Sequence, residues 1–167
     1  EGKVALIPFV PGAATSIQRE EGFRQGIKSI PGLRLAAVQY SQSDVATAMS
    51  VMEDILTAHP DLKGVFAANE AGALGVARAL EAREVAGKVK VVAFDAAPNQ
   101  IEALRRGTLH ALVVQNPYRM GYDGVRLALD AIARRPVPRR VDPGITVVTA
   151  ANLDTPAVRK ALHPAGE

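Results

Sequence analysis

Short, almost continuous apolar runs alternate with amphipathic helical segments along nearly the whole chain, and this alternation restricts the fold more than any other feature. Val4–Ile7, Val65–Ala68 and Leu109–Val114 are such runs. Strands of a parallel sheet are buried on both faces and read as continuous apolar runs, and helices usually connect them. We therefore predict an α/β fold that is doubly wound, with a mostly parallel sheet flanked by helices.

Capping and breaking residues set the expected boundaries. Ser43 or Asp44 caps the second helix, while Pro98 begins the fourth helix and Gly107 ends it. The small residues of the third helix, among them Gly72 and Gly75, should allow close packing on the sheet. We expect strands at about residues 4–7, 33–40, 65–68, 90–94, 109–114 and 145–149, and helices at about 15–29, 45–56, 70–83, 98–106, 119–134 and 155–162.

Composition excludes several classes of protein. A chain of 167 residues with 48% hydrophobic and 22% charged residues can form one soluble globular domain. No apolar run approaches the ~20 residues that span a bilayer. The absence of cysteine excludes disulfides and thiolate metal sites. The net charge of +3 comes from scattered residues without interleaved aromatics, so we expect no nucleic-acid binding by this segment.

Polar residues follow three of the predicted strands directly. Asn69, Asp95 and Gln115 each close an apolar run, and Arg19 lies on the helix after the first strand, near the same edge. Open α/β sheets bind ligands in the crevice beyond the carboxyl ends of their strands. A guanidinium, two amides and a carboxylate can satisfy hydroxyl groups that both donate and accept hydrogen bonds. The pattern therefore indicates a binding site for a hydroxyl-rich ligand.

Each of these residues also has a purely structural interpretation. Asn69 is a common type of helix N-cap, and a helix N-terminus attracts carboxylates such as Asp95. Arg19 is typical of a solvated helix face, and Gln115 could simply end a strand. Pro98 places the next helix start a few residues after Asp95, which leaves that carboxylate free to face the crevice. Taken together at one sheet edge, the four residues favour a ligand site.

Other candidate motifs are absent or incomplete. His59, His110 and His163 lack metal-ligand spacing, and we expect neither a metal nor a cofactor. Gly72 and Gly75 do not form a glycine-rich turn directly after a strand, and no Walker lysine follows a glycine loop. No serine lies in a nucleophile elbow. Nothing in the sequence therefore forms a catalytic constellation, and we do not expect an enzyme.

Five blocks of the sequence resemble the sugar-binding proteins of bacterial ABC importers, and closely the ribose-binding type. The resemblance covers nearly the whole chain, and the order and spacing of the blocks match. The blocks are Gly12 with Arg19 and Gly22-Phe23, Val51-Met52 with Ile55 to Asp61, Val65 to Glu70, Val92 to Pro98, and Gln115-Asn116-Pro117 with Met120-Gly121.

That family has two lobes that close over a sugar, and the resemblance implies that residues 1–167 are the carboxyl-terminal lobe of a type I periplasmic binding protein. It implies that Arg19, Asn69, Asp95 and Gln115 hydrogen-bond a monosaccharide. An aromatic residue often stands where this chain has Ser43, so Gln42 or Ser43 would supply a hydrogen bond instead of stacking. The amino-terminal lobe would precede Glu1, the location would be periplasmic, and the partner would be the membrane permease.

The helix expected at about residues 119–134 carries an apolar stripe that must be buried against another surface. Tyr118, Tyr122, Val125, Leu129 and Ile132 are spaced by four, three, four and three residues. In the family this helix, within segment 117–140, packs on the amino-terminal lobe. In this chain alone we expect the helix to fold back on itself or to pair with a second copy as a homodimer, by domain swapping.

Two rival functions belong to other classes. The effector domain of a lactose-repressor-type regulator shares the fold, would carry a helix-turn-helix before it, and would be cytoplasmic. An enzyme on the same scaffold is disfavoured by the missing phosphate loop and nucleophile. The blocks around residues 58–61 and 115–117 favour the transport protein, by resemblance.

Overall fold

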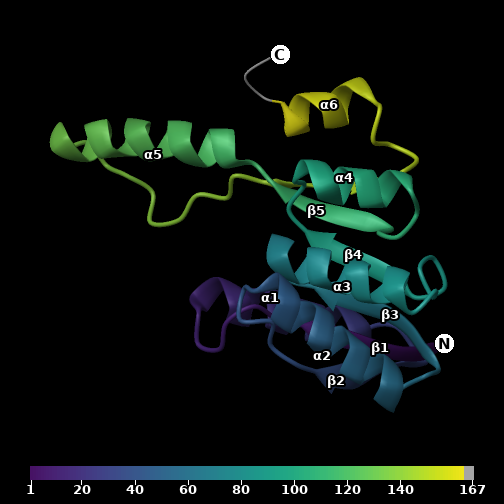
Figure 1. Cartoon of the computed structure of the whole chain (residues 1–167). Coiled ribbons are helices and arrows are strands. Elements are labelled where there is room, and N and C mark those ends of the chain that lie inside the picture. Colours follow the sequence, from purple (N-terminus) through teal and green to yellow (C-terminus); the bar gives the residue numbers. More distant parts are fainter. Residues whose placement is uncertain (164–167) are drawn as a thin grey trace.

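The computed structural model describes residues 1–163, which form one six-stranded sheet with helices on both faces (Figure 1). The strands are β1 (Gly2–Ile7), β2 (Leu33–Val38), β3 (Leu62–Ala67), β4 (Lys90–Phe94), β5 (Ala111–Gln115) and β6 (Ile145–Thr149). The helices are α1 (Ala14–Lys28), α2 (Val45–Ala58), α3 (Glu70–Ala82), α4 (Pro98–Arg105), α5 (Pro117–Ile132) and α6 (Pro156–Leu162). The predicted α/β fold is confirmed.

The strand order is β2-β1-β3-β4-β5-β6. The first five strands are parallel, and β6 runs antiparallel to β5, pairing Ile145 with Gln115. This order agrees with a doubly wound, mostly parallel sheet, because the chain moves outward in both directions from β1 and β3. The carboxyl ends of β1 to β5 all lie at one edge, which fixes where a crevice can form.

The start of α5 differs from the one expected, whereas a predicted cap is confirmed at the start of α2. Helix α5 begins at Pro117 rather than near Arg119, because Asn116 caps it by accepting a hydrogen bond from the Arg119 backbone N–H at 2.9 Å. Proline is well placed in a first helical turn, where its missing N–H has no partner to lose. Asp44, one of the two predicted caps, holds the start of α2 by accepting from the Thr47 N–H at 2.7 Å.

The sheet separates two apolar clusters. Along β1, Ala5 and Ile7 face the larger cluster, which also takes in residues of α2, α3, α4 and α6. Leu6 points to the opposite face and packs with Phe66 and with Phe23 of α1. The rings of Phe23 and Phe66 stack with their centres 5.4 Å apart. This alternation follows from the two-residue period of a strand. Helix α1 therefore packs on the face of the sheet opposite to α2, α3, α4 and α6.

Gly75 lets helices α2 and α3 approach closely. A Cβ atom built on Gly75 would lie 2.5 Å from the Ala48 Cβ, 2.5 Å from the Val45 carbonyl oxygen and 2.7 Å from the Met49 amide nitrogen. All three neighbours belong to α2, so at Gly75 the small residue permits helix–helix packing rather than the expected packing on the sheet. Only a residue without a side chain fits between the two backbones.

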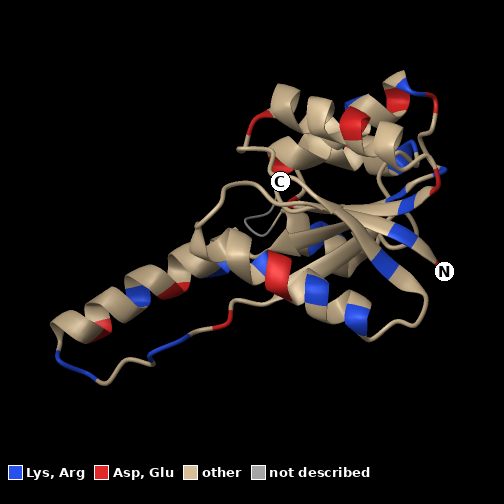
Figure 2. Cartoon of the chain, turned by 90° about the horizontal axis from the view of Figure 1, so that it is seen from below, with Lys and Arg blue, Asp and Glu red and all other residues tan. Residues whose placement is uncertain are grey.

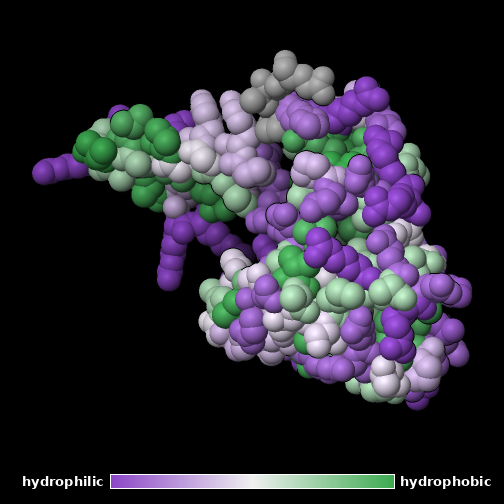
Figure 3. Space-filling model, in the orientation of Figure 1, coloured by the Kyte–Doolittle hydropathy of each residue, from purple (hydrophilic) through white to green (hydrophobic). Residues whose placement is uncertain are grey.

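Helix α5 extends away from the rest of the chain and buries no residue (Figure 1). We call Tyr118, Tyr122, Val125, Leu129 and Ile132 the α5 stripe; each is between 54% and 79% exposed. Apolar residues cover much of this projecting helix in the space-filling view (Figure 3). The helix is a single element and is not folded back on itself. Its apolar side therefore has no partner among residues 1–163.

Candidate functional site

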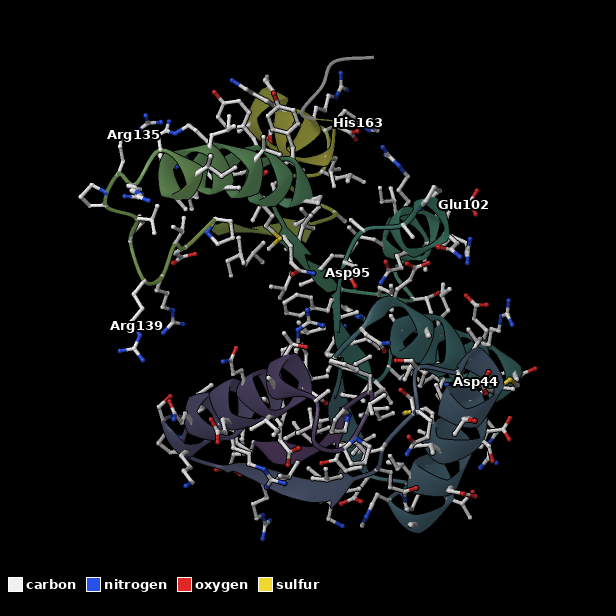
Figure 4. The ribbon with its side chains drawn as sticks, turned by 90° about the vertical axis from the view of Figure 1, so that its left-hand side faces the viewer. Asp44, Asp95, Glu102, Arg135, Arg139 and His163 are labelled. Atoms are coloured by element: carbon white, nitrogen blue, oxygen red, sulfur yellow. The ribbon has the colours of Figure 1, made fainter. Side chains whose placement is uncertain are left out.

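Asp95 and Gln115 form one half of the predicted site, as expected from neighbouring strands. Asp95 directly follows β4 and Gln115 ends β5, and the Gln115 Nε2 donates a hydrogen bond to Asp95 Oδ1 at 2.8 Å. In Figure 4, Asp95 lies in the middle of the molecule, whereas Asp44 lies at the start of α2. Within residues 1–163, this bond leaves the second oxygen of the carboxylate and the amide oxygen of Gln115 available to a ligand.

Arg19 is held near this pair by two kinds of contact. Its Nη1 donates to the Ala68 carbonyl oxygen at 2.6 Å, and its guanidinium carbon lies 3.6 Å from the ring centre of Phe94 and 5.4 Å from that of Phe9. Partial burial lowers the pKa of the Arg19 guanidinium, and the Asp95 carboxylate opposes that shift. Arginine stays charged at neutral pH nevertheless. The side chain is therefore oriented before any ligand arrives, and among the described residues only one of its five N–H donors is used.

Asn69 has both its structural role and a geometry suited to a ligand. Its Oδ1 accepts the Gly72 backbone N–H at 3.0 Å as the N-cap of α3, and its Nδ2 donates to the Ser43 Oγ at 3.1 Å. One N–H of the amide remains to be donated. The cap interpretation is thus correct, and the Ser43 hydroxyl fixes the orientation of the amide. The structure places Asn69 and Ser43 as one pair, and Arg19 reaches this pair through the carbonyl of Ala68.

The backbone is unusual at the same positions. Gln42, Ser43 and Asp95 have φ values of 54°, 57° and 72°, in the left-handed region. They are three of the five non-glycine residues with positive φ among residues 1–163. Such conformations cost on the order of 1 kcal/mol or more and often cluster at functional sites. At Asp95 the turn lets the chain leave β4 while the carboxylate stays at the sheet edge.

Phe94 and Glu20, the sequence neighbours of Asp95 and Arg19, were not singled out from the sequence. Phe94 looked like one more strand residue, although its position directly before Asp95 was a signal. Glu20 accepts hydrogen bonds from Arg24 at 2.8 Å and from the Tyr40 hydroxyl at 2.9 Å, which ties α1 to the segment after β2. The bond from Arg24 is the main reason why the pKa of Glu20 is lowered.

A small cavity of about 250 Å³ adjoins the Asp95–Gln115 pair. Its wall includes Met120 of α5 and Leu162 of α6, so the last helix of the described chain reaches the same edge of the sheet. No group of three or more His, Asp or Glu side chains in residues 1–163 could hold a metal ion. None of the helices described is both long and apolar enough to cross a membrane. Basic and acidic residues are interspersed over the ribbon (Figure 2).

Comparison with known proteins identifies the family. A family model described as a periplasmic binding protein domain matches residues 1–136, and the chain therefore belongs to this family. The ribose import binding protein of Salmonella typhimurium is 38% identical over 128 residues, covering 75% of this chain and 42% of that protein. The D-allose-binding periplasmic protein of Escherichia coli is 33% identical over 130 residues, covering 78% of this chain and 42% of the relative.

Solved structures agree with this family and with the fold. An ABC transporter solute-binding protein of Agrobacterium vitis with bound D-fucose is 40% identical, with a TM-score of 0.89 over 95% of this chain and 55% of that one. A carbohydrate transporter solute-binding protein of Agrobacterium radiobacter, in complex with D-arabinose, is 39% identical, with a TM-score of 0.92 over 97% and 55%. The chain thus spans less than half the length of the curated relatives above and about 55% of these solved chains.

Proposed function

We propose that this chain is the carboxyl-terminal lobe of a solute-binding protein that binds a monosaccharide in a cleft between two lobes and delivers it to an ABC importer. The observation that carries the proposal is the convergence of Arg19, Asn69, Asp95 and Gln115 on one sheet edge, with donors and acceptors still available. Relatives named for ribose and allose, and solved relatives holding fucose and arabinose, support a monosaccharide as the ligand.

Each residue has a role that follows from its contacts. Asp95 accepts from sugar hydroxyls through the oxygen that Gln115 does not use. Arg19 donates through a guanidinium held on the face of Phe94, and charge-assisted bonds of this kind are the strong ones. Asn69 donates its remaining N–H, and Ser43 both orients Asn69 and replaces the apolar stacking of an aromatic residue with a hydroxyl. A sugar presenting a polar group toward Ser43 is favoured by this arrangement.

Segment 117–140, which contains α5, is the part of the chain that would contact a second lobe or a second copy. In the complete protein we propose that α5 packs its stripe on the amino-terminal lobe, since that stripe is exposed here. The 167-residue chain alone pairs α5 with a second copy. Burying each large apolar side chain contributes roughly 1.5–3 kcal/mol, so an unopposed stripe is unfavourable in water.

The protein acts by binding and conformational change rather than by chemistry. Closure of two lobes around a sugar is a hinge motion, and the closed form is what a permease would recognise. The periplasm is the location that such a role requires. An effector domain of a lactose-repressor-type regulator would share the fold, but the relatives reported above are import and solute-binding proteins.

Isothermal titration calorimetry on the complete two-lobe protein tests the proposal, with D-ribose, D-allose, D-arabinose and D-fucose as ligands. Asp95→Asn keeps the shape of the side chain but removes the charge, and should weaken binding by about 10- to 100-fold, since a hydrogen bond to a charged group contributes ≈ 1.5–3 kcal/mol. Asp61→Asn is the matched control, because Asp61 precedes β3 at the opposite edge and pairs only with Lys3 among residues 1–163.

Two results would contradict the proposal. One is the absence of binding to any of these sugars, and the other is equal loss of affinity in the Asp95 and Asp61 variants. The 167-residue chain alone should show no affinity tighter than millimolar, because half a cleft neither encloses the sugar nor excludes water. A calorimetric signal at micromolar sugar would show that the second lobe is not needed.

A further inference from the structure

A hydrogen-bond network joins helix α1 to the segment between β2 and α2, residues 39–44, which we call the β2–α2 loop. Both oxygens of the Glu20 carboxylate on α1 take part. Oε1 accepts from Nε and Nη2 of Arg24 at 3.0 and 2.8 Å, and Oε2 accepts from the Tyr40 hydroxyl at 2.9 Å. Among residues 1–163, the bond between Tyr40 and Glu20 is the only side-chain hydrogen bond between this loop and α1.

The β2–α2 loop also carries a residue of the candidate site. The Asn69 Nδ2 donates to the Ser43 Oγ at 3.1 Å, and Gln42 and Ser43 have φ values of 54° and 57°. Residues other than glycine keep such left-handed conformations only where the surrounding contacts over-determine them. The contacts that fix this loop therefore also fix the direction in which the amide of Asn69 points.

Other bonds of the loop hold it to the sheet and to α2. Ser41 is buried, and its backbone N–H and its Oγ donate to the Pro8 carbonyl oxygen at 2.9 and 3.3 Å, directly after β1. Asp44 caps α2 through the Thr47 N–H. None of these bonds reaches α1, the helix that presents Arg19 to the site. The link between the loop and that helix is made by the hydroxyl of Tyr40.

The hydrogen bonds connect α1, the β2–α2 loop and the end of β3 in a closed circuit. Arg19 and Glu20 are consecutive on α1, and consecutive helical residues are rotated by about 100°, so their side chains reach different partners. Ala68 and Asn69 are consecutive after β3 and supply the other end of the circuit. Its three links are Arg19 to Ala68, Asn69 to Ser43, and Tyr40 to Glu20.

We propose that Tyr40 and Glu20 are positioning residues for the sugar site, because their hydrogen bond closes this circuit and keeps the Ser43 hydroxyl on the amide of Asn69. The inference rests on the proposed function and adds two residues that set sugar affinity without touching the sugar. Without the bond, the loop spends part of its time with Ser43 away from Asn69. The apparent dissociation constant then rises in inverse proportion to the fraction that is competent to bind.

Tyr40→Phe in the complete two-lobe protein tests this role, because it removes the hydroxyl and keeps the aromatic ring. By calorimetry, the dissociation constant for the tightest of the four sugars should rise about three- to tenfold. Thr108→Val is the matched control: the Thr108 hydroxyl also donates to a carboxylate, Glu81 Oε1, at 2.9 Å, but it lies before β5 at the opposite edge of the sheet. The control should lower stability to urea as Tyr40→Phe does, and leave sugar affinity unchanged within about twofold.

Two further comparisons show whether Tyr40 acts through Ser43. In a protein that already carries Ser43→Ala, the added Tyr40→Phe should change affinity by less than about twofold, because the hydroxyl that it positions is absent. Glu20→Gln keeps an oxygen that can accept from Tyr40, so it should lose less affinity than Glu20→Ala. A general loss of stability would not produce either pattern.

Hydrogen exchange follows the loop without any sugar. The Asp44 backbone N–H donates to the Ser41 carbonyl oxygen at 3.0 Å, and it should exchange at least threefold faster in Tyr40→Phe. An unchanged exchange rate overturns the positioning role, whatever the protein binds.

Three binding results have distinct meanings. Unchanged affinity in Tyr40→Phe, with stability lowered as in the control, would show that the bond is only structural. An equal loss with and without Ser43→Ala would show that Tyr40 does not act through Ser43, which also overturns the inference. Absence of binding to all four sugars by the unmodified protein contradicts the proposed function instead, and the exchange rate at Asp44 then decides the inference.

Discussion

Replacing Gly75 by alanine should separate α2 from α3 and destabilise the protein. The added Cβ would lie 2.5 Å from the Val45 carbonyl oxygen and 2.5 Å from the Ala48 Cβ, whereas carbon atoms pack best at ≈ 3.5–4.0 Å. These neighbours are backbone or a Cβ fixed to it, so no rotamer change relieves the overlap. The two helices must therefore move apart by about 1 Å.

Two opposing effects set the size of the change. Overpacking costs typically 1–3 kcal/mol, and a rigid neighbour places Gly75→Ala at about the upper end of that range. Alanine in a helix interior returns about 1 kcal/mol relative to glycine. We expect a net loss of about 2 kcal/mol in the free energy of unfolding, which lowers Tm by about 4–8 °C in a chain of this length.

Urea denaturation followed by circular dichroism measures this difference, with the slope m checked for two-state behaviour. Gly124→Ala in α5 is the matched control, because a Cβ there would meet no atom within 4 Å. That variant should gain about 0.5–1 kcal/mol, since only the helix propensity changes. Equal stabilisation in both variants would refute the close packing of α2 on α3.

The remaining predictions concern pH and the site. Burial, and to a smaller extent the Lys90 ammonium, lower the pKa of His110. At a pH below the ordinary pKa of histidine, the unfolded chain therefore binds more protons than the folded one. The free energy of unfolding should therefore fall as pH drops through about 6.5 and toward the lowered pKa, and His110→Gln should flatten this slope in urea titrations at pH 5–8. Phe94→Leu removes the ring beneath Arg19, a contact contributing ≈ 0.5–2 kcal/mol, and should weaken sugar binding of the two-lobe protein about two- to thirtyfold by calorimetry. Unchanged affinity would show that Arg19 needs no such support.

The fold was largely predictable from the sequence, because continuous apolar runs indicate strands that are buried on both faces. Val65–Ala68 and the run before Asp95 could hardly be anything but central parallel strands. The direction of β6 was not predictable from the sequence. More and less exposed residues alternate along Ile145–Thr149, and no helix ends directly before this strand. Its antiparallel pairing follows from the long excursion through α5.

The site was predictable only in part. Strand ends locate Asn69, Asp95 and Gln115 by topology, and the bond between Asp95 and Gln115 follows from their places on neighbouring strands. The contact of the Arg19 guanidinium with the Phe94 ring depends on how α1 lies on the sheet. No local sequence pattern encodes that arrangement. The left-handed backbone at Ser43 likewise reflects tertiary constraint, because serine has no marked preference for that conformation.

Arg19 joins helix α1 to the sugar edge of the sheet: its Nη1 donates to the Ala68 carbonyl oxygen, and its guanidinium lies on the ring of Phe94. A long side chain that is already fixed loses little conformational entropy when it binds a ligand, because that loss, up to about 2 kcal/mol for arginine, has been met on folding. Part of the affinity for a sugar is therefore set by the packing of α1 on the sheet. A substitution that loosens α1 should weaken sugar binding without touching any residue of the site.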